Sequence, residues 1–116
     1  MTIQSKSIHA PKDISDGIRV CVMRRIRSTF DFDVWLPALA PSNQLLDACK
    51  EGKINWEGYV ERFSQEVLEN PQKAPFFQML RLLSESSVVT LLCHEETDEK
   101  CHRRLLIEKL LRECLK

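Results

Sequence analysis

The chain has 116 residues, with 17 Lys and Arg against 17 Asp and Glu, a formal net charge of zero, and 43% hydrophobic residues. This length predicts a single domain over residues 1–116, and the ordinary apolar and charged fractions exclude wholesale disorder. The zero net charge argues against a nucleic-acid partner. No apolar run approaches the roughly 20 residues that cross a bilayer, so we expect no membrane partner.

The cysteine count bears on the cellular compartment. The five cysteines are an odd number, and the first residues carry no apolar segment typical of a secretion signal. We therefore expect reduced thiols and a cytoplasmic protein. Cys21 and Cys114 lie in apolar patterns, which predicts that they are small core residues.

The first part of the chain predicts two strands. Residues 2–9 alternate weakly and predict a short edge strand, and residues 11–17 predict a loop that ends in the turn dipeptide Asp16-Gly17. Residues 18–23 are rich in β-branched side chains and predict a strand that places on one face Ile18, Val20 and Val22.

The middle of the chain predicts helices. After a polar and aromatic loop over 28–33, short helices are expected over 35–39 and 45–50. Longer helices are expected over 56–69, where Asn55 is a suitable N-cap, and over 74–83. The apolar stripes of these two helices are typical of a buried core and contain Trp56, Tyr59, Val60, Phe63, Val67, Phe76, Phe77, Leu80 and Leu83.

The last part of the chain predicts one strand and one helix. Residues 88–93 are nearly continuously apolar, as in a strand that is buried on both faces of a parallel sheet, and residues 98–115 predict a helix. The long segment 24–87 between the two strong strands favours parallel pairing. We therefore predict an α/β fold, with a small, about three-stranded, mostly parallel sheet and helices packed on both faces.

Residues with useful chemistry follow the two strong strands. In an open parallel sheet, ligands bind beyond the carboxyl ends of the strands, so two stretches distant in sequence are expected to meet in one crevice. These stretches contain Arg24, Arg25, Cys93, Cys101, His102 and Arg103. Because arginine binds phosphate or carboxylate in a bidentate manner, the candidate anion-binding residues are Arg24, Arg25 and Arg103. The acidic residues within 95–99 favour the opposite interpretation, in which the arginines are already paired.

A thiol nucleophile is a further hypothesis for the same crevice. Cys101 or Cys93 would attack, and His102 would act as acid and base. Cys101 has the better electrostatics because it is expected in the first turn of a helix that also carries Arg103. The simpler alternative is that both thiols are inert. The dipeptides ending at His94 and His102 have the composition of a zinc site without its spacing, so no metal ligands are assigned, and no motif indicates a cofactor.

Five short motifs follow one another in the order found in a known family. They are Asp16-Gly17-Ile18-Arg19-Val20-Cys21-Val22, Trp35-Leu36-Pro37-Ala38-Leu39-Ala40-Pro41-Ser42, Asn70-Pro71, Val89-Thr90-Leu91-Leu92-Cys93 and Cys101-His102-Arg103. Together they resemble the family called domain of unknown function 488, and most of all its short YeaO-like branch. The resemblance covers nearly the whole chain and implies a compact cytoplasmic α/β domain, without an activity, substrate or cofactor to transfer. It also implies that the characteristic Cys-His-Arg triplet lies at 101–103 and the basic strand end at Arg24.

The sequence departs from the YeaO-like pattern directly after the first strong strand. Members of that branch usually have aspartate where Met23 stands, followed by arginine and a Trp-Pro-Arg-Gly stretch, and here residues 25–29 replace that stretch. If the aspartate and tryptophan build the site of the family, the resemblance implies an altered site in this chain.

Two functions therefore compete. The leading hypothesis is an uncharacterised cytoplasmic protein that binds a small anionic or phosphate-containing ligand in the crevice, with enzymatic activity left open. The alternative is a non-catalytic interaction module or homodimer without a small-molecule site. It is motivated by the absence of a complete catalytic motif and by three aromatic residues available for contacts, Phe30, Phe32 and Trp35.

Overall fold

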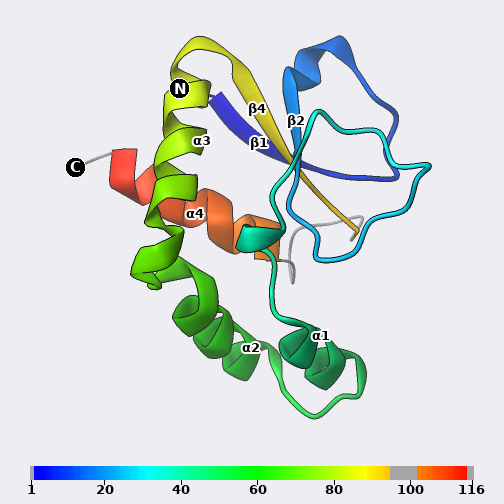
Figure 1. Ribbon diagram of the computed structural model, residues 1–116, viewed down its shortest axis with the longest axis vertical. Helices are drawn as coiled ribbons and strands as arrows, with labels where there is room; N and C mark the ends of the chain where they lie inside the picture. The colour runs from blue at the N-terminus through cyan, green and yellow to red at the C-terminus, as the bar shows by residue number, and fades with distance from the viewer. Residues whose placement is uncertain (1, 95–101, 115–116) are drawn as a thin grey trace.

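The computed structural model describes residues 2–94 and 102–114, which contain one four-stranded parallel sheet (Figure 1). The strands lie in the order β1-β4-β2-β3, and their bounds are β1 Thr2–Ser7, β2 Ile18–Cys21, β3 Val34–Trp35 and β4 Val88–Cys93. Each neighbouring pair is parallel. The predicted small α/β domain with parallel strands is confirmed, with one strand more than the expected three.

The additional strand, β3, corrects the helix predicted over 35–39. Trp35 pairs with Cys21 in the sheet, and only a 3-10 turn over Pro37–Leu39 is helical. Proline restricts the residue before it to extended backbone and has no N–H to lose at the first helical position, so the turn begins at Pro37 itself. The backbone N–H of Leu36 donates to the carbonyl of Cys21 and extends the pairing by one bond (2.8 Å).

Four α-helices occur where the sequence predicts helices. Their bounds are α1 Asn43–Lys50, α2 Trp56–Phe63, α3 Ala74–Ser86 and α4 His102–Cys114. The predicted cap Asn55 accepts from the N–H of Gly58, while α1 begins earlier than predicted because Ser42 caps it by accepting from the N–H of Leu45. None of these helices, in the part of the chain that the structure describes, is long and apolar enough to span a bilayer.

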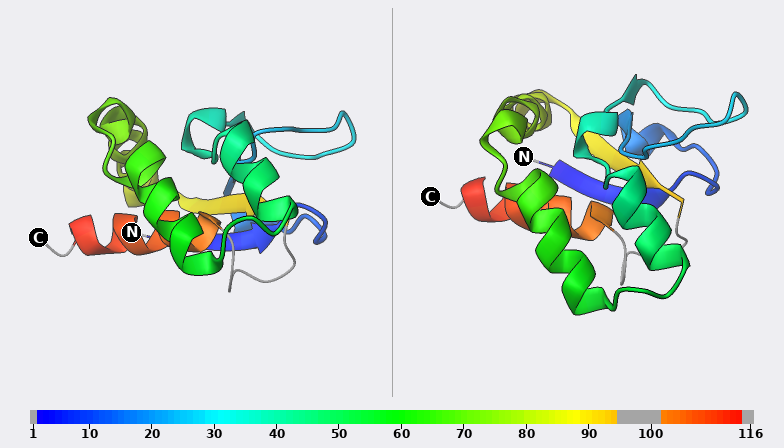
Figure 2. Two further views of the ribbon diagram at one scale, coloured as in Figure 1. Left: turned by 90° about the horizontal axis from the view of Figure 1, so that it is seen from below. Right: turned by 60° about the horizontal axis from the view of Figure 1, so that its bottom comes forward.

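The hydrophobic core joins one face of the sheet to all four α-helices. Val20, Val89 and Leu91 of the strands have no exposed surface, and they belong to the same cluster as the helical residues Leu45, Tyr59, Phe63, Phe77, Leu80, Leu105, Leu106 and Leu110. Figure 2 shows α1 and α3 on the same side of β4. The predicted core stripes are confirmed, and Cys21 is buried as predicted. The side chain of Cys114 lies outside the described residues.

Helices were predicted on both faces of the sheet, but in the described part of the chain all four α-helices pack on one face. The second face is covered by irregular chain and by one 3-10 turn, Ile14–Asp16. Here Asp16 forms ion pairs with Arg19 and with Lys6 (2.9 Å), and Thr90 donates to the Asp16 carbonyl. Gly17 follows with φ of 62°, and a Cβ at this position would lie 2.3 Å from the Val88 carbonyl oxygen. Only glycine fits this turn, which therefore brings the ion-pair cluster of Lys6, Asp16 and Arg19 close against β4.

Candidate functional site

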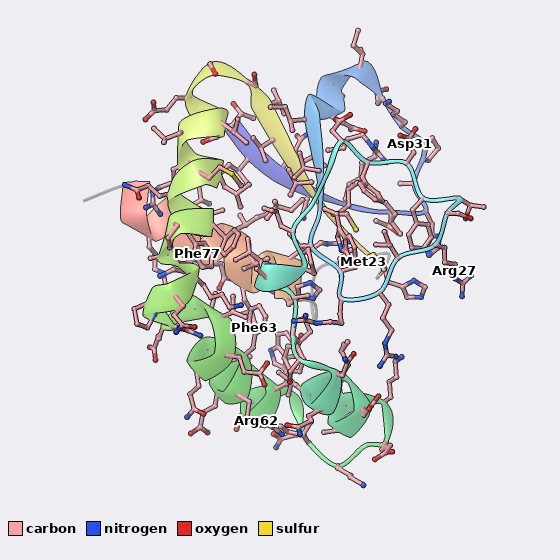
Figure 3. All side chains as sticks on the ribbon, viewed as in Figure 1. Met23, Arg27, Asp31, Arg62, Phe63 and Phe77 are labelled. Atoms are coloured by element: carbon pink, nitrogen blue, oxygen red, sulfur yellow. The ribbon has the colours of Figure 1, made fainter. Side chains whose placement is uncertain are left out.

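A pocket of about 530 Å³ lies at the carboxyl ends of β2 and β4. Its walls come from the chain after β2, from α1 and α2, from the end of β4 and from the start of α4. Its lining residues are Met23, Arg24, Arg25, Ile26, Arg27, Phe30, Pro41, Leu46, Cys49, Lys50, Trp56, Tyr59, Cys93, His94 and His102. Figure 3 labels Met23 at this end of β2 and Arg27 on the loop that follows. We call this hollow the carboxyl-end pocket. It lies where the sequence predicts a crevice.

The two arginines directly after β2 have different anchors. Arg24 is half-buried, and its guanidinium donates from Nε to the carbonyl of Pro41 (3.1 Å) and from Nη2 to that of Ala40 (3.2 Å). Arg25 is exposed, and it donates from Nη2 to Asn43 Oδ1 (3.0 Å) and lies 3.8 Å from a carboxylate oxygen of Asp47. Arg24 therefore fixes the segment before α1, whereas Arg25 remains at the surface of the pocket.

Cys93 and His102 meet in the depth of the carboxyl-end pocket. Cys93 is the last residue of β4 and His102 is the first of α4, and the two residues are 5% and 6% exposed. The Cys93 sulfur lies 3.6 Å from Nδ1 and 3.9 Å from Nε2 of the imidazole. The same Nε2 lies 2.6 Å from the carbonyl oxygen of Val22, the residue directly after β2. The imidazole therefore joins the ends of both central strands.

A column of rings supports this imidazole. Trp56 stacks on Tyr59 with ring centroids 5.2 Å apart, Tyr59 stacks on Phe63 at 6.0 Å, and Phe63 meets His102 edge-on at 5.7 Å. The first three rings lie on one face of α2 because they are three and four residues apart. Figure 3 labels Phe63 on α2. The Phe63 end of the column lies in the hydrophobic core, and the Trp56 end forms part of the pocket wall.

The helix that carries the ring column also holds α1 in place. After Phe63, α2 continues as a π-helical segment, Ser64–Leu68, in which Glu66 points to the start of α1. One oxygen of Glu66 accepts from the N–H of Ser42 (2.9 Å), and the other accepts from its hydroxyl (2.7 Å). Since Ser42 is the N-cap of α1, this carboxylate fixes the helix that forms one wall of the pocket. Figure 1 shows α1 and α2 side by side beyond the strand ends.

One of the sequence-predicted site residues, Arg103, does not line the pocket. Arg103 is 2% exposed, and its Nη1 donates to the carbonyl of Lys6 at the end of β1 (2.9 Å). Cys101 lies outside the described residues. The structure thus brings together Arg24, Arg25, Cys93 and His102 around the pocket. It directs the Arg103 side chain to the carbonyl of Lys6 in β1 instead.

His94 lines the pocket and contacts a second histidine, His9. His94 follows Cys93, and its Nδ1 lies 3.0 Å from Nε2 of His9, whose ring meets Phe30 edge-on. Both imidazoles are exposed. Within the described residues, no group of three or more His, Cys, Asp or Glu side chains is arranged to hold a metal ion.

Several lining residues have no strong signal in the sequence. Lys50, Cys49 and Leu46 come from a short helix that the sequence does not connect to either strand, and Arg27 follows in the same basic run as Arg24. The position of α1 depends on the Glu66–Ser42 contact, which is non-local. Trp56 and Tyr59 belong to a stripe that we interpreted from the sequence as core alone. Their position in the first turn of α2 is the one signal that they could lie beyond the sheet.

The remaining thiol and the loop aromatics bear on the alternative hypotheses. Burial raises the pKa of the Cys21 thiol, an effect only partly opposed by a backbone hydrogen bond involving Met23, so this cysteine is unreactive near neutral pH. Trp35 is 40% exposed, and its indole N–H donates to the Met23 carbonyl (2.7 Å). Phe30 and Phe32 are half-buried. The interaction hypothesis stays a prediction.

The fold and the pocket together define a small parallel α/β domain with a cationic hollow at the carboxyl ends of its central strands. The chain belongs to the DUF488 family, because the family model described as the Active DUF488-N3 subclade matches residues 3–114. Comparison with curated proteins and with solved structures found no match. The resemblance to this family is thereby confirmed, while the assignment to its YeaO-like branch stays a prediction.

Proposed function

We propose that the protein binds a small anionic ligand, bearing a phosphate or carboxylate group, in the carboxyl-end pocket. The observation that carries this proposal is the charge of the lining. Arg24, Arg25, Arg27 and Lys50 line the pocket, and no carboxylate does so among the described residues. Because the whole chain has zero formal net charge, these cations are a local concentration rather than a reflection of composition.

The arginines differ in the donors that they retain for a ligand. The hydrogen bonds of Arg24 in the described part of the chain use Nε and Nη2, which leaves Nη1 for an anion. Arg27 is exposed and has no ion pair within those residues. A phosphate oxygen that accepts from two such guanidinium groups would gain charge-assisted hydrogen bonds, which are about twice as strong as neutral ones.

The other walls of the pocket favour a ligand with an apolar body. Trp56, Tyr59, Phe30 and Ile26 supply aromatic and aliphatic surface beside the cations. A volume near 530 Å³ is within the range of sites for small organic ligands, roughly 300–1,000 Å³, and is much larger than a single phosphate needs. The proposed ligand therefore combines an anionic group with a ring or a short apolar chain.

The proposed compartment is the cytoplasm. The odd number of cysteines is typical of a chain that folds without structural disulfides, and the exposed thiol of Cys49 would persist best in a reducing environment. Anionic metabolites bearing phosphate are also compatible with this compartment.

Calorimetric titration with phenyl phosphate, and with uncharged phenol as the matched ligand, tests the proposal. We expect phenyl phosphate to bind and to raise the melting temperature, and we expect phenol to bind at least about tenfold more weakly, a difference of roughly 1.4 kcal/mol. Arg25→Ala/Arg27→Ala should weaken the binding of phenyl phosphate by about tenfold or more.

The matched control is Lys12→Ala/Arg112→Ala, which removes the same charge from exposed positions that do not line the pocket. This control should bind as the wild type does. Equal weakening in the two double variants would show a diffuse electrostatic effect and would overturn the proposal, as would a failure of phenyl phosphate to bind at all.

A further inference from the structure

Two exposed histidines follow neighbouring strands of the sheet. His9 lies two residues after β1, and His94 directly follows β4. The parallel register pairs the last residues of these strands, Ser7 and Cys93, and the N–H of Ile8 extends the pairing by donating to the Cys93 carbonyl (2.8 Å). Because both strands end at the same edge, two imidazoles that are 85 residues apart in the sequence meet there.

A single hydroxyl group fixes the backbone at both histidines. Ser7 is buried, and its Oγ accepts from the N–H of His9 (3.2 Å) and donates to the carbonyl of His94 (3.4 Å). The His9 ring also meets the Phe30 ring edge-on, with centroids 5.7 Å apart. The imidazoles are therefore carried by a restricted backbone, which lowers the entropic cost of binding a ligand between them.

The distances between the two rings fit a pair of metal ligands. Nε2 of His9 lies 3.0 Å from Nδ1 of His94, and the ring centroids are 4.8 Å apart. When two imidazoles bind one ion at about 2.1 Å, their nitrogens are about 3.0 Å apart at a right angle and about 3.4 Å apart at the tetrahedral angle, with centroids about 4.5–5.2 Å apart. A straight N–H···N hydrogen bond of the observed length would separate the centroids by about 5.2 Å. The contact is therefore bent, and both of its separations fit neighbouring ligands of one ion.

We propose that His9 and His94 bind one divalent transition-metal ion of the zinc class at the wall of the carboxyl-end pocket. Neutral imidazole is a common ligand of such ions. Without metal, the pair shares one proton in a hydrogen bond, and the ion would take the place of that proton. Among the residues that the structure describes, no third His, Cys, Asp or Glu is arranged with this pair, so water or a ligand group would complete the coordination.

The position of the ion gives it a role in ligand binding. His94 lines the carboxyl-end pocket, so an ion on its Nδ1 would lie beside the space that the pocket encloses. Oxygen atoms of carboxylates and phosphates coordinate zinc, and the anionic group of a ligand could therefore bind the ion as well as the arginines. This role rests on the proposed function, whereas the metal site depends only on the two imidazoles.

Calorimetric titration with zinc chloride at pH 7, on protein prepared without a histidine tag, tests the metal site. We expect one ion per chain, and we expect His9→Gln and His94→Gln each to weaken binding about tenfold or more, because a single imidazole does not chelate. The double variant should be little weaker than either single variant. Both side chains are exposed, so the variants should keep the circular dichroism spectrum of the wild type. Unchanged affinity in these variants, or no zinc binding by the wild type, would overturn the proposal.

A thiol is the competing zinc ligand, and two measurements exclude or reveal it. Cys49→Ser removes an exposed thiol that lines the same pocket, and it should bind zinc as the wild type does. Cobalt(II) in place of zinc reports the donor atoms, because a thiolate ligand adds an intense charge-transfer band that imidazole ligands lack. We expect no such band. Its presence, or weakened zinc binding in Cys49→Ser, would overturn the assignment to the two histidines.

Titration with phenyl phosphate in the presence and absence of zinc tests the role of the ion in ligand binding. Zinc should tighten the binding of phenyl phosphate to the wild type about tenfold but not to His9→Gln/His94→Gln, and phenyl phosphate should tighten the binding of zinc by the same factor. Zinc held by the two histidines without this coupling would contradict the role in ligand binding alone. Zinc held there without any binding of phenyl phosphate would overturn the proposed function and leave the metal site. Binding of phenyl phosphate by a protein that does not bind zinc would overturn the metal site alone.

Discussion

Arginines occupy two contrasting environments in this protein. On the second face of the sheet, the Arg19 side chain is 1% exposed and is paired with Asp16, which also binds Lys6. At the carboxyl ends of the strands, Arg24, Arg25 and Arg27 line a pocket whose described lining contains no carboxylate. The first group is neutralised within the fold, and the second has an excess of positive charge beside a hollow.

The contrast shows how charge is used in two ways within a chain of zero net charge. Removing Arg19 from water is costly, so the fold supplies a carboxylate and two hydrogen bonds to the Asp31 carbonyl. A binding site has the opposite requirement, because its donors must remain available until the ligand arrives. Arg24 combines the two roles, because it donates hydrogen bonds to two backbone carbonyls and also lines the pocket.

Asp16→Asn should have the largest effect on stability, because it removes the carboxylate that neutralises Arg19 and Lys6. It leaves the buried Arg19 without a carboxylate, and breaking a buried pair in this way costs about 3–5 kcal/mol of unfolding free energy. Urea denaturation measures this loss. The control Asp31→Asn removes a carboxylate that is 62% exposed and 3.7 Å from Lys12, and it should cost under about 1 kcal/mol. Similar losses in the two variants would contradict the distinction.

The Asp16 carboxylate should also make the unfolding free energy decrease at acidic pH. Burial raises the pKa of Asp16, but hydrogen bonds from the Asp13 backbone and from the Lys6 and Arg19 side chains outweigh it, so the pKa lies below its ordinary value of 3.8. The unfolded chain therefore binds more protons in acid. The contribution of Asp16 is complete above about pH 5 and is lost as the pH falls through its folded pKa.

Urea denaturation of the wild type and of Asp16→Asn between pH 7 and pH 3 measures this decrease in unfolding free energy. The difference in unfolding free energy between the two proteins should be constant down to about pH 5 and should narrow below it. A difference that stays constant down to pH 3 would contradict the lowered pKa of Asp16.

Substitutions of Arg24 and Arg25 should have smaller effects on stability, and they test whether anchoring of the chain and ligand binding are separate roles. Arg24→Ala removes hydrogen bonds to two backbone carbonyls and should cost about 1–3 kcal/mol. Arg25→Ala removes a side chain that is 57% exposed and should cost under about 0.5 kcal/mol. Urea denaturation compares them, with Arg24→Lys as a control that keeps the charge but not the planar donors. A loss for Arg25→Ala as large as that for Arg24→Ala would contradict the separation of anchoring from ligand binding.

The sequence predicted the central strands and the main helices because burial is encoded locally. Residues 88–93 are apolar except for Thr90, and β4 has these bounds and is buried on both faces. Asp16-Gly17 was sufficient for the turn, since no other residue type fits that backbone. The helix over 35–39 is wrong because Trp35 pairs with Cys21, and a two-residue strand has too short a pattern to detect.

The candidate site was predictable only in part. Parallel pairing places the ends of β2 and β4 together, so Arg24, Arg25 and Cys93 could be expected at one edge. The pairing of Cys93 with His102 rather than with another imidazole follows from the direction in which α4 begins, and no local pattern encodes that direction. Arg103, one residue further along α4, is directed to the Lys6 carbonyl instead of the pocket.

The sequence by itself determined which segments are buried, because apolar periodicity is a local property. It also determined at which edge of the sheet most of the predicted site residues gather, because the long connection between the two central strands favours parallel pairing. The tertiary structure decided which of those residues meet. The contact of His102 with Val22 and Cys93, the wall contributed by Lys50, and the burial of Arg103 all depend on how helices distant in sequence pack on the sheet. Packing of this kind is set by side-chain contacts across the whole core.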